Sequence, residues 1–307
     1  MTTDLAIETH GLSKRFGRRM AVEDLDIAVP TGAVAGFVGP NGSGKTTTMA
    51  MLLGLVAPTA GSATVLGKPL AQPSTYLRRL GALIEYPAFY PGLSGEDNLS
   101  VLATIGGYDR AQIPVLLDQA GLGSRGGDRF GSYSLGMKQR LGVAAALLGD
   151  PELVILDEPS NGLDPVGIRE MRELVREISG DGRTVFVSSH VLAELEQVCD
   201  WLVMIDGGAL LFQGPADELL KRGSASIICA TEQTADVQRL HQTLGASGLP
   251  ATIDGRRVVV GINSSDPQIA AAEVSRAATA QGIVLTELRC ERMSLEEQYL
   301  ALLKGGN

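Results

Sequence analysis

The sequence predicts an α/β protein whose main domain has a parallel sheet with helices on both faces, followed by a smaller α+β domain. In the main domain, apolar strands alternate with helical stretches, at 153–157, 167–179, 184–188, 191–198 and 201–205. An apolar strand at 34–38 leads directly into a glycine-rich loop and a helix over 46–54. Residues 225–289 follow the order β-α-β-β-α-β, which predicts a ferredoxin-like second domain.

The length of 307 residues agrees with two domains at about 150 residues each. We expect the first domain over 1–222 and the accessory α+β domain over 223–307. Within the first domain, short alternating runs predict antiparallel strands. The strands expected in its first 85 residues, besides the one at 34–38, are 5–10, 22–29, 63–66 and 80–85. A helical subdomain is expected over about 87–150. A capping box at Ser294 predicts a short helix near the end of the chain.

Composition excludes several classes of function. There are 26 Lys and Arg against 35 Asp and Glu, a net charge of −9, so the chain lacks the basic field of a nucleic-acid-binding protein. The three cysteines are far apart and indicate neither a metal site nor a disulfide. No run of 18 apolar residues and no basic leader is present, so we expect a cytoplasmic chain without a membrane span.

The segment Gly39 to Thr47 fits the phosphate-binding pattern G-x-x-x-x-G-K-[ST] and lies between a strand and a helix, as that pattern requires. Its glycines let amide groups turn toward a phosphate, Lys45 reaches the β and γ phosphates, and Thr46 is a ligand for Mg²⁺. We therefore predict an ATP site at Gly39, Pro40, Asn41, Gly42, Ser43, Gly44, Lys45, Thr46 and Thr47.

Two acids follow the apolar strand at 153–156. Asp157 is predicted to hold Mg²⁺ through water, and Glu158 to orient or deprotonate the attacking water. Paired acids at a strand end are weak evidence alone, since a solvated turn gives the same pattern. With the phosphate loop upstream, the two motifs together predict a P-loop NTPase.

The segment Tyr133-Ser134-Leu135-Gly136-Met137-Lys138-Gln139-Arg140 resembles the signature motif of ATP-binding cassette (ABC) ATPases. The resemblance implies that Ser134 and the Gly136 amide, at a helix N-terminus, receive the γ-phosphate of ATP held by a second subunit. Leu135 and Met137 depart from the commonest form of the motif, at a glycine and a glutamine position.

Other segments match the family in its usual order. Residues 160–164 resemble the D-loop, which gives Asp164 a place at the nucleotide interface, and His190 resembles the switch histidine that contacts the γ-phosphate. Phe16 falls where an aromatic ring stacks on adenine. Singly these residues are weak evidence, because a lone His or Phe is more often structural.

Glu85 occupies the position where most ABC ATPases carry the Q-loop glutamine. This acid, the run that follows it and the S-L-G-M-K-Q-R signature are similar to the bacitracin- and lantibiotic-type drug-resistance exporters. We expect Glu85 to bind Mg²⁺ or the water and to link ATP to transport. A solvated turn acid is the alternative.

The resemblance implies the ATP-hydrolysing subunit of an exporter of drugs, antibiotics or peptides. Two subunits, expected as a homodimer, would enclose two ATP and drive a separate polytopic membrane permease, from a peripheral position on the cytoplasmic face of the membrane. The Tyr86–Leu102 stretch is the expected docking surface. The alternative is a soluble ABC ATPase that acts in translation or DNA repair. A module that senses ATP without hydrolysing it is disfavoured, because Glu158 and His190 are both present. The second domain is expected to serve dimerisation or regulation, or only to steady the first.

Overall fold

The computed structural model describes residues 4–222, 225–262 and 267–305. Its contacts divide the chain into two compact units, Met1–Ala216 and Asp217–Asn307. Helix α7 (Ala216–Arg222) crosses this division and ends at the domain limit expected from the sequence.

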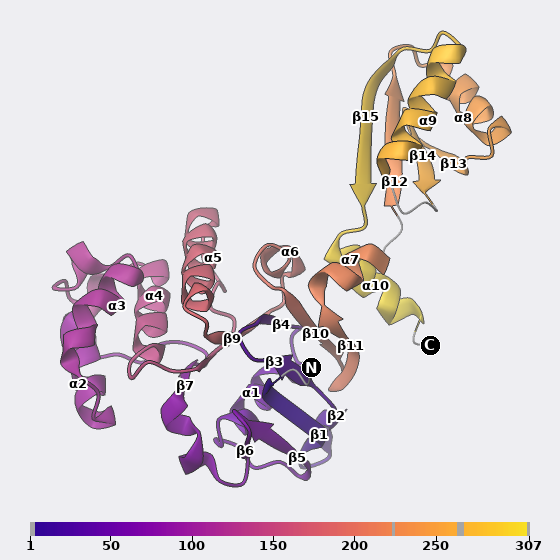
Figure 1. The fold of residues 1–307 in the computed structure, drawn as a ribbon. Coiled ribbons are helices and arrows are strands. Elements are labelled where there is room, and N and C mark those ends of the chain that lie inside the picture. The colour runs from indigo at the N-terminus through magenta and orange to yellow at the C-terminus, as the bar shows by residue number, and fades with distance from the viewer. Residues whose placement is uncertain (1–3, 223–224, 263–266, 306–307) are drawn as a thin grey trace. The chain divides into compact units, whose positions relative to one another are not determined.

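A six-stranded, mostly parallel sheet forms the centre of the first unit (Figure 1). Its strands, in spatial order, are β11 (Ala209–Pro215), β10 (Trp201–Asp206), β4 (Val34–Val38), β9 (Thr184–Ser189), β8 (Leu153–Leu156) and β7 (Leu80–Leu83). Only β11 is antiparallel to its neighbour. Every residue of β4, β8 and β9 is buried, as expected of strands covered on both faces.

The register aligns the carboxyl ends of the central strands. Val38 of β4 pairs with Ser189 of β9, and Leu156 of β8 pairs with Val187 of β9 and Leu83 of β7. The segments that follow these strands therefore begin at one edge of the sheet, where ligands bind in α/β folds. These are the segments that carry the predicted chemistry.

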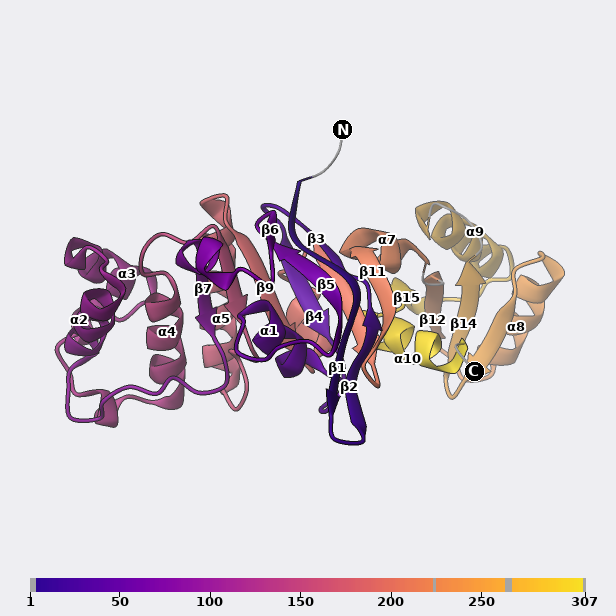
Figure 2. The same ribbon diagram turned by 90° about the horizontal axis from the view of Figure 1, so that it is seen from below.

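An antiparallel sheet lies beside the first, with helix α1 (Lys45–Leu52) near its strands (Figure 2). Its strands are β1 (Leu5–Phe16), β2 (Arg19–Leu25), β3 (Ala28–Pro30), β5 (Ala60–Val65) and β6 (Lys68–Pro69). One apolar core joins both sheets to the helix through buried residues such as Ile7, Val22, Phe37, Met49, Leu52, Ile155 and Phe186. This continuous core fixes the loop before α1 against both sheets.

The remaining helices of the unit lie in two places. Helices α2 (Gly95–Gly106), α3 (Ile113–Gln119) and α4 (Leu135–Ala146) gather beyond β7, where the helical subdomain is expected (Figure 1). Helices α5 (Pro165–Gly180) and α6 (Leu192–Leu195) lie on the face of the parallel sheet opposite α1. Both faces of the sheet are thus covered.

Helix α4 packs on β7 in backbone contact. A Cβ atom at Gly81 of β7 would fall 1.8 Å from the carbonyl oxygen of Ala146, and one at Gly142 of α4 would fall 2.9 Å from Leu83. No larger side chain fits at Gly81 without separating helix and strand. Glycine at these two positions therefore fixes the distance between the helical subdomain and the sheet.

The second unit has the element order β-α-β-β-α-β, the order of a ferredoxin-like unit, followed by a final helix. These elements are β12 (Ala225–Thr231), α8 (Asp236–Ala246), β13 (Ala251–Asp254), β14 (Arg257–Ile262), α9 (Pro267–Ala280), β15 (Leu285–Arg292) and α10 (Leu295–Gly305). The sheet order is β13-β14-β12-β15, and all neighbouring strands are antiparallel. The unit has its own apolar core, centred on residues such as Ile227, Leu240, Val260 and Val274.

Ser294 begins α10 with the expected capping box. Its backbone N–H donates to the Glu297 carboxylate at 2.8 Å, and its Oγ accepts from the Glu297 N–H at 3.3 Å. Two amide groups at the start of the helix are thereby satisfied.

Two of the differences from the sequence prediction have a clear local cause. The run expected as one strand at 22–29 divides into β2 and β3, because the Thr9 hydroxyl donates to the Leu25 carbonyl at 2.6 Å and accepts from the Ile27 N–H at 2.9 Å. At this point the Thr9 side chain takes the place of backbone hydrogen bonds between β1 and the neighbouring strand. Strand β11 was not predicted, because it contains Gly214 and Pro215 and lacks an alternating pattern.

Candidate nucleotide-binding site

The loop Gly39–Thr47 connects β4 to α1 in a conformation that depends on glycine. Gly42 and Gly44 have positive φ angles of 82° and 108°, and a Cβ at Gly44 would lie 2.5 Å from the Ala21 carbonyl oxygen. Positive φ in such a loop turns successive amide groups into a concave surface that suits an anion. Because α1 begins at Lys45, the partial positive charge of its N-terminus adds to this field.

Lys45 is a buried cation at the centre of this loop, with 5% of its side chain exposed. Its Nζ donates to the Gly39 carbonyl at 2.7 Å and lies 3.2 Å from Glu158 Oε1. A buried ammonium needs such partners. Lys45 therefore links the loop to Glu158, the acid that is predicted to act on the attacking water.

Thr46 and Asp157 form a set of oxygen atoms that suits Mg²⁺. The Thr46 hydroxyl donates to Asp157 Oδ2 at 2.7 Å, and Asp157 is 4% exposed. Mg²⁺ prefers hard oxygen ligands and completes its coordination with phosphate and water. The loop, Lys45 and this oxygen pair fit Mg²⁺ with a nucleoside triphosphate.

Ser188, at the end of β9, connects the two acids and was not predicted from the sequence. Its hydroxyl donates to Asp157 Oδ1 at 2.6 Å and accepts from the Glu158 N–H at 2.8 Å. Ser188 is completely buried, so both bonds are protected from water. Only the pairing of β8 with β9 reveals this role, although the residue lies two positions before His190.

Glu158 is held in an unusual backbone conformation and by two side chains. Its φ of 47° lies in the left-handed region, which non-glycine residues rarely adopt and which is associated with functional sites. His190 Nδ1 lies 2.7 Å from Glu158 Oε2, while Lys45 lies near the other oxygen. The structure thus brings Lys45 and His190 each into contact with one carboxylate oxygen of Glu158.

A hollow of about 310 Å³ lies over the loop. It is lined by Phe16, Arg19, Ala21, Asn41, Gly42, Gly44, Lys45, Thr46, Thr47 and Glu158. Phe16 is 51% exposed, and the Lys14 ammonium lies 4.9 Å from the centre of its ring. Its stacking on adenine stays a prediction.

Arg19 is a second residue of the hollow that the sequence reasoning missed. It pairs with Phe16 in the β1–β2 hairpin, so the two side chains share one face, and a Cβ at Gly42 would lie 3.4 Å from an Arg19 guanidinium nitrogen. This pairing was predictable from the sequence, because a two-residue turn at Gly17-Arg18 places Phe16 and Arg19 opposite each other in a hairpin. Arg19 thus brings a cation beside the loop.

Ser134, Gly136 and Asp164 are not among the residues that line this hollow. Ser134 caps α4 by accepting from the Met137 N–H at 3.3 Å, and Asp164 caps α5 by accepting from the Gly167 N–H at 2.7 Å. A Cβ at Gly136 would lie 3.8 Å from Leu163, so the predicted signature and D-loop are neighbours. Their contact with nucleotide stays a prediction.

Glu85 follows β7 at the same sheet edge, and the Leu83 carbonyl accepts from the Asp157 N–H at 2.8 Å. The Glu85 side chain is exposed and does not line the hollow over the phosphate loop. The φ angle of Glu85 is 58°. The predicted role as a ligand of Mg²⁺ or water stays open on this geometry.

Within the described ranges, no helix has the length and apolar character needed to cross a membrane.

Comparison with known proteins places this site in a family. Residues 22–161 match the family model described as ABC transporter. The chain is 38% identical over 304 residues to the bacitracin transport ATP-binding protein BcrA of Bacillus licheniformis, covering 98% of each chain. It is 39% identical over 211 residues to the lantibiotic transport ATP-binding protein SrtF of Streptococcus pyogenes, covering 69% of this chain and 91% of SrtF.

A solved structure of the ATP-binding subunit of an ABC transporter superposes with a TM-score of 0.63 at 32% identity. It covers 71% of this chain and 93% of its own. The resemblance inferred from the motifs is confirmed, and so is the P-loop ATPase fold of the core.

Proposed function

The chain belongs to the ABC transporter ATP-binding family, and from this we propose that it hydrolyses ATP to drive the export of a drug, antibiotic or peptide. The relatives that transport bacitracin and a lantibiotic support this class of cargo. The observation that carries the proposal is the contact of Glu158 with both Lys45 and His190 beside the phosphate loop. This arrangement places a base next to two groups that attract the γ-phosphate.

Each residue has a definite role in this proposal. The loop amides and Lys45 bind the phosphates, Phe16 stacks on adenine, and Thr46 and Asp157 hold Mg²⁺. Bound Mg²⁺ would neutralise charge on the phosphates. Glu158 accepts a proton from the attacking water, and His190 orients Glu158 and the γ-phosphate.

We propose that two copies of the chain complete the ATP sites. Ser134 and Gly136 lie at an exposed helix N-terminus outside the chain's own hollow, a position that suits the phosphate of a second subunit. Leu163 lies beside Gly136, so the D-loop and the signature would meet the same partner. A homodimer is the simplest assembly.

A polytopic permease is the membrane partner in this proposal, with the chain bound at the cytoplasmic face. The stretch Tyr86–Leu102 would dock to it, because Tyr86 and Tyr90 are 64% and 62% exposed and follow Glu85. Exposed aromatic side chains are typical anchors of protein interfaces. The second unit would support dimerisation or regulation.

The test uses Glu158→Gln as bait in detergent extracts of the native cell, with Mg-ATP. This variant should bind ATP and stay closed because it lacks the base, and a membrane protein with several spans should co-purify. The control is Lys45→Ala combined with Glu158→Gln, which should lose the partner because it cannot bind the phosphates. Recovery of ribosomal or DNA-repair proteins instead would contradict the export proposal and favour a soluble ABC ATPase.

A further inference from the structure

Leu135 is a residue at which the predicted signature departs from a glycine, and the proposed function gives it no task. It begins α4 directly after the cap Ser134, and 37% of its side chain is exposed. A Cβ atom at Gly162 of the D-loop would lie 3.2 Å from Leu135 Cδ2. Leu135 therefore lies directly on Gly162. A glycine in place of Leu135 would have no side chain to make this contact.

A reverse contact joins the same two segments. A Cβ at Gly136 would lie 3.8 Å from Leu163 Cδ2, and one at Gly167 of α5 would lie 3.3 Å from Leu163 Cβ. Leu163 thus contacts the first turns of α4 and α5. The signature and the D-loop each supply a leucine that lies on the glycine of the other. Because glycine has no side chain, each leucine approaches the opposite backbone closely.

An ion pair continues this contact along the two helices. Arg140 Nη1 lies 3.1 Å from Glu170 Oε2, and 15% of the Arg140 side chain is exposed. Each of these residues lies six positions after the cap of its helix, which is Ser134 for α4 and Asp164 for α5. Helices α4 and α5 therefore start beside each other and stay in contact into their second turn.

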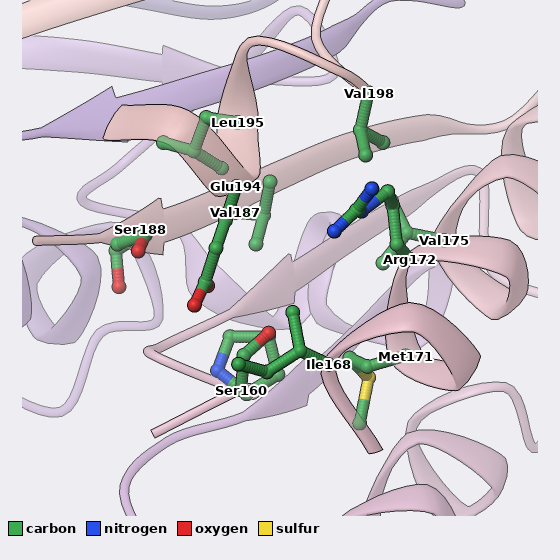
Figure 3. A pocket seen from close by; sticks show the side chains of 12 residues that line it. Ser160, Ile168, Met171, Arg172, Val175, Val187, Ser188, Glu194, Leu195 and Val198 are labelled. Atoms are coloured by element: carbon green, nitrogen blue, oxygen red, sulfur yellow. The ribbon is translucent and has the colours of Figure 1, made fainter. Parts of the chain in front are cut away.

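Hollows border the D-loop where it faces β9 and α6. Helix α5 lies between α4 and α6 (Figure 1). Residues 160–163 of the D-loop line a hollow of about 120 Å³ that includes Glu158 and His190. Ser160 also lines a mainly apolar hollow of about 30 Å³, whose walls include Ile168 of α5 (Figure 3). Since close packing is what fixes a segment, the position of the D-loop is set by its contact with the signature.

The D-loop is joined in turn to the predicted base. The Glu158 carbonyl accepts from the Asn161 N–H at 3.0 Å, and the Ser160 carbonyl accepts from the Leu163 N–H at 3.1 Å. Two overlapping turns therefore connect Leu163 to Glu158. A shift of the D-loop changes the backbone that aims the Glu158 carboxylate.

We infer that Leu135 is a positioning residue, which by its contact with Gly162 holds the D-loop, and through it Glu158, in a fixed place relative to the signature of the same chain. This inference rests on the proposed function and deepens it. The signature and the D-loop of one chain thus act as one unit. Leu135 touches neither nucleotide nor water in this role.

The experiment measures ATP hydrolysis and ATP affinity for the full chain and its variants. Leu135→Ala removes the atoms that lie on Gly162 and should lower kcat roughly tenfold, because a small misplacement of a reacting group is costly. ATP affinity should stay within about twofold, since Leu135 does not line the hollow over the phosphate loop. Leu135→Met should restore most of kcat, because its side chain is apolar and of similar volume. The matched control is Val115→Ala, which truncates an exposed apolar residue in the first turn of α3 and should keep the wild-type kcat.

Gly162→Ala tests the contact from the other side. Its methyl group would meet Leu135 and displace the D-loop, so kcat should fall. In the Leu135→Ala background the same change should have a smaller effect, because the methyl group then has space. Strain from the positive φ of Gly162 is equal in both backgrounds and cancels in this comparison.

Four outcomes would overturn the inference. They are an unchanged kcat in Leu135→Ala, an equal loss in Leu135→Met, a loss of ATP affinity in place of kcat, and independent effects of Leu135→Ala and Gly162→Ala. Absence of hydrolysis in the wild-type chain would instead contradict the proposed function.

Discussion

Lys45 Nζ lies 3.2 Å from Glu158 Oε1, so the buried cation of the phosphate loop and the partly buried predicted base form an ion pair. His190 holds the other carboxylate oxygen of Glu158. Both partners of Glu158 are groups that a γ-phosphate would attract. Binding of ATP would therefore compete for them and release the carboxylate to act on water.

Glu158→Gln should abolish hydrolysis and preserve binding. The amide cannot accept the proton of water, so we expect kcat to fall by at least about 100-fold. ATP affinity should be retained or increased, since Lys45 loses its competing negative charge. Single-turnover hydrolysis and calorimetric titration measure the two effects, and a kcat within tenfold of wild type would contradict the role of Glu158.

Ser188→Ala should lower kcat roughly tenfold because it removes a buried hydrogen bond to each acid. The neighbouring Ser189→Ala is the control, since among the residues that the structure describes the Ser189 hydroxyl bonds to Val191 alone. Steady-state kinetics against Mg²⁺ concentration should show a higher Mg²⁺ requirement in Ser188→Ala alone. Identical profiles for the two variants would exclude this role for Ser188.

Arg19→Ala should weaken the binding of ATP and ADP alike, by roughly tenfold, as expected for loss of one charge-assisted hydrogen bond. Arg18→Ala is a matched control, because Arg18 is also exposed but does not line the hollow. Titration with both nucleotides at two salt concentrations measures the effect. Equal affinities of the two variants would show that Arg19 does not contact the nucleotide.

Glu85→Gln tests the expected link between ATP and transport. If Glu85 is a ligand of Mg²⁺ or water, the neutral amide should raise the Mg²⁺ concentration needed for half-maximal hydrolysis. The assay compares Mg²⁺ dependence and coupled turnover in membranes that contain the permease. No change in either quantity would leave Glu85 as a solvated acid of the turn.

Leu240→Ala should destabilise the second unit by about 3 kcal/mol, because Leu240 is completely buried in that unit's core. The first unit has a separate core, so nucleotide affinity should be unchanged. Chemical denaturation followed by hydrogen exchange assigns the loss of stability to one unit. A fall in ATP affinity would show that the site depends on the folding of the second unit.

Local patterns predicted the parts of the site that are formed by continuous segments. The strand, loop and helix around Lys45 are encoded within twenty residues, and Asp157 and Glu158 directly follow an apolar strand. The resemblance of residues 133–140 to the signature motif also placed Ser134 at a helix N-terminus, where it caps α4. In each case the residue and the element that positions it are adjacent in the sequence.

The missed residues depend on contacts between distant segments. Ser188 meets Asp157 across 31 residues only because β8 and β9 are neighbours in register. Arg19 reaches Gly42 because a hairpin is folded over the phosphate loop.

The backbone contact between Gly81 and Ala146 gives α4 a mechanical property. The helix carries Ser134 at its N-terminus and presses on β7 at the other end, about 18 Å away for twelve residues. No side chain separates Gly81 from Ala146, so the end of α4 cannot move toward β7. In the proposed assembly, α4 would therefore couple the helix N-terminus expected to face a second copy to the strand that precedes Glu85.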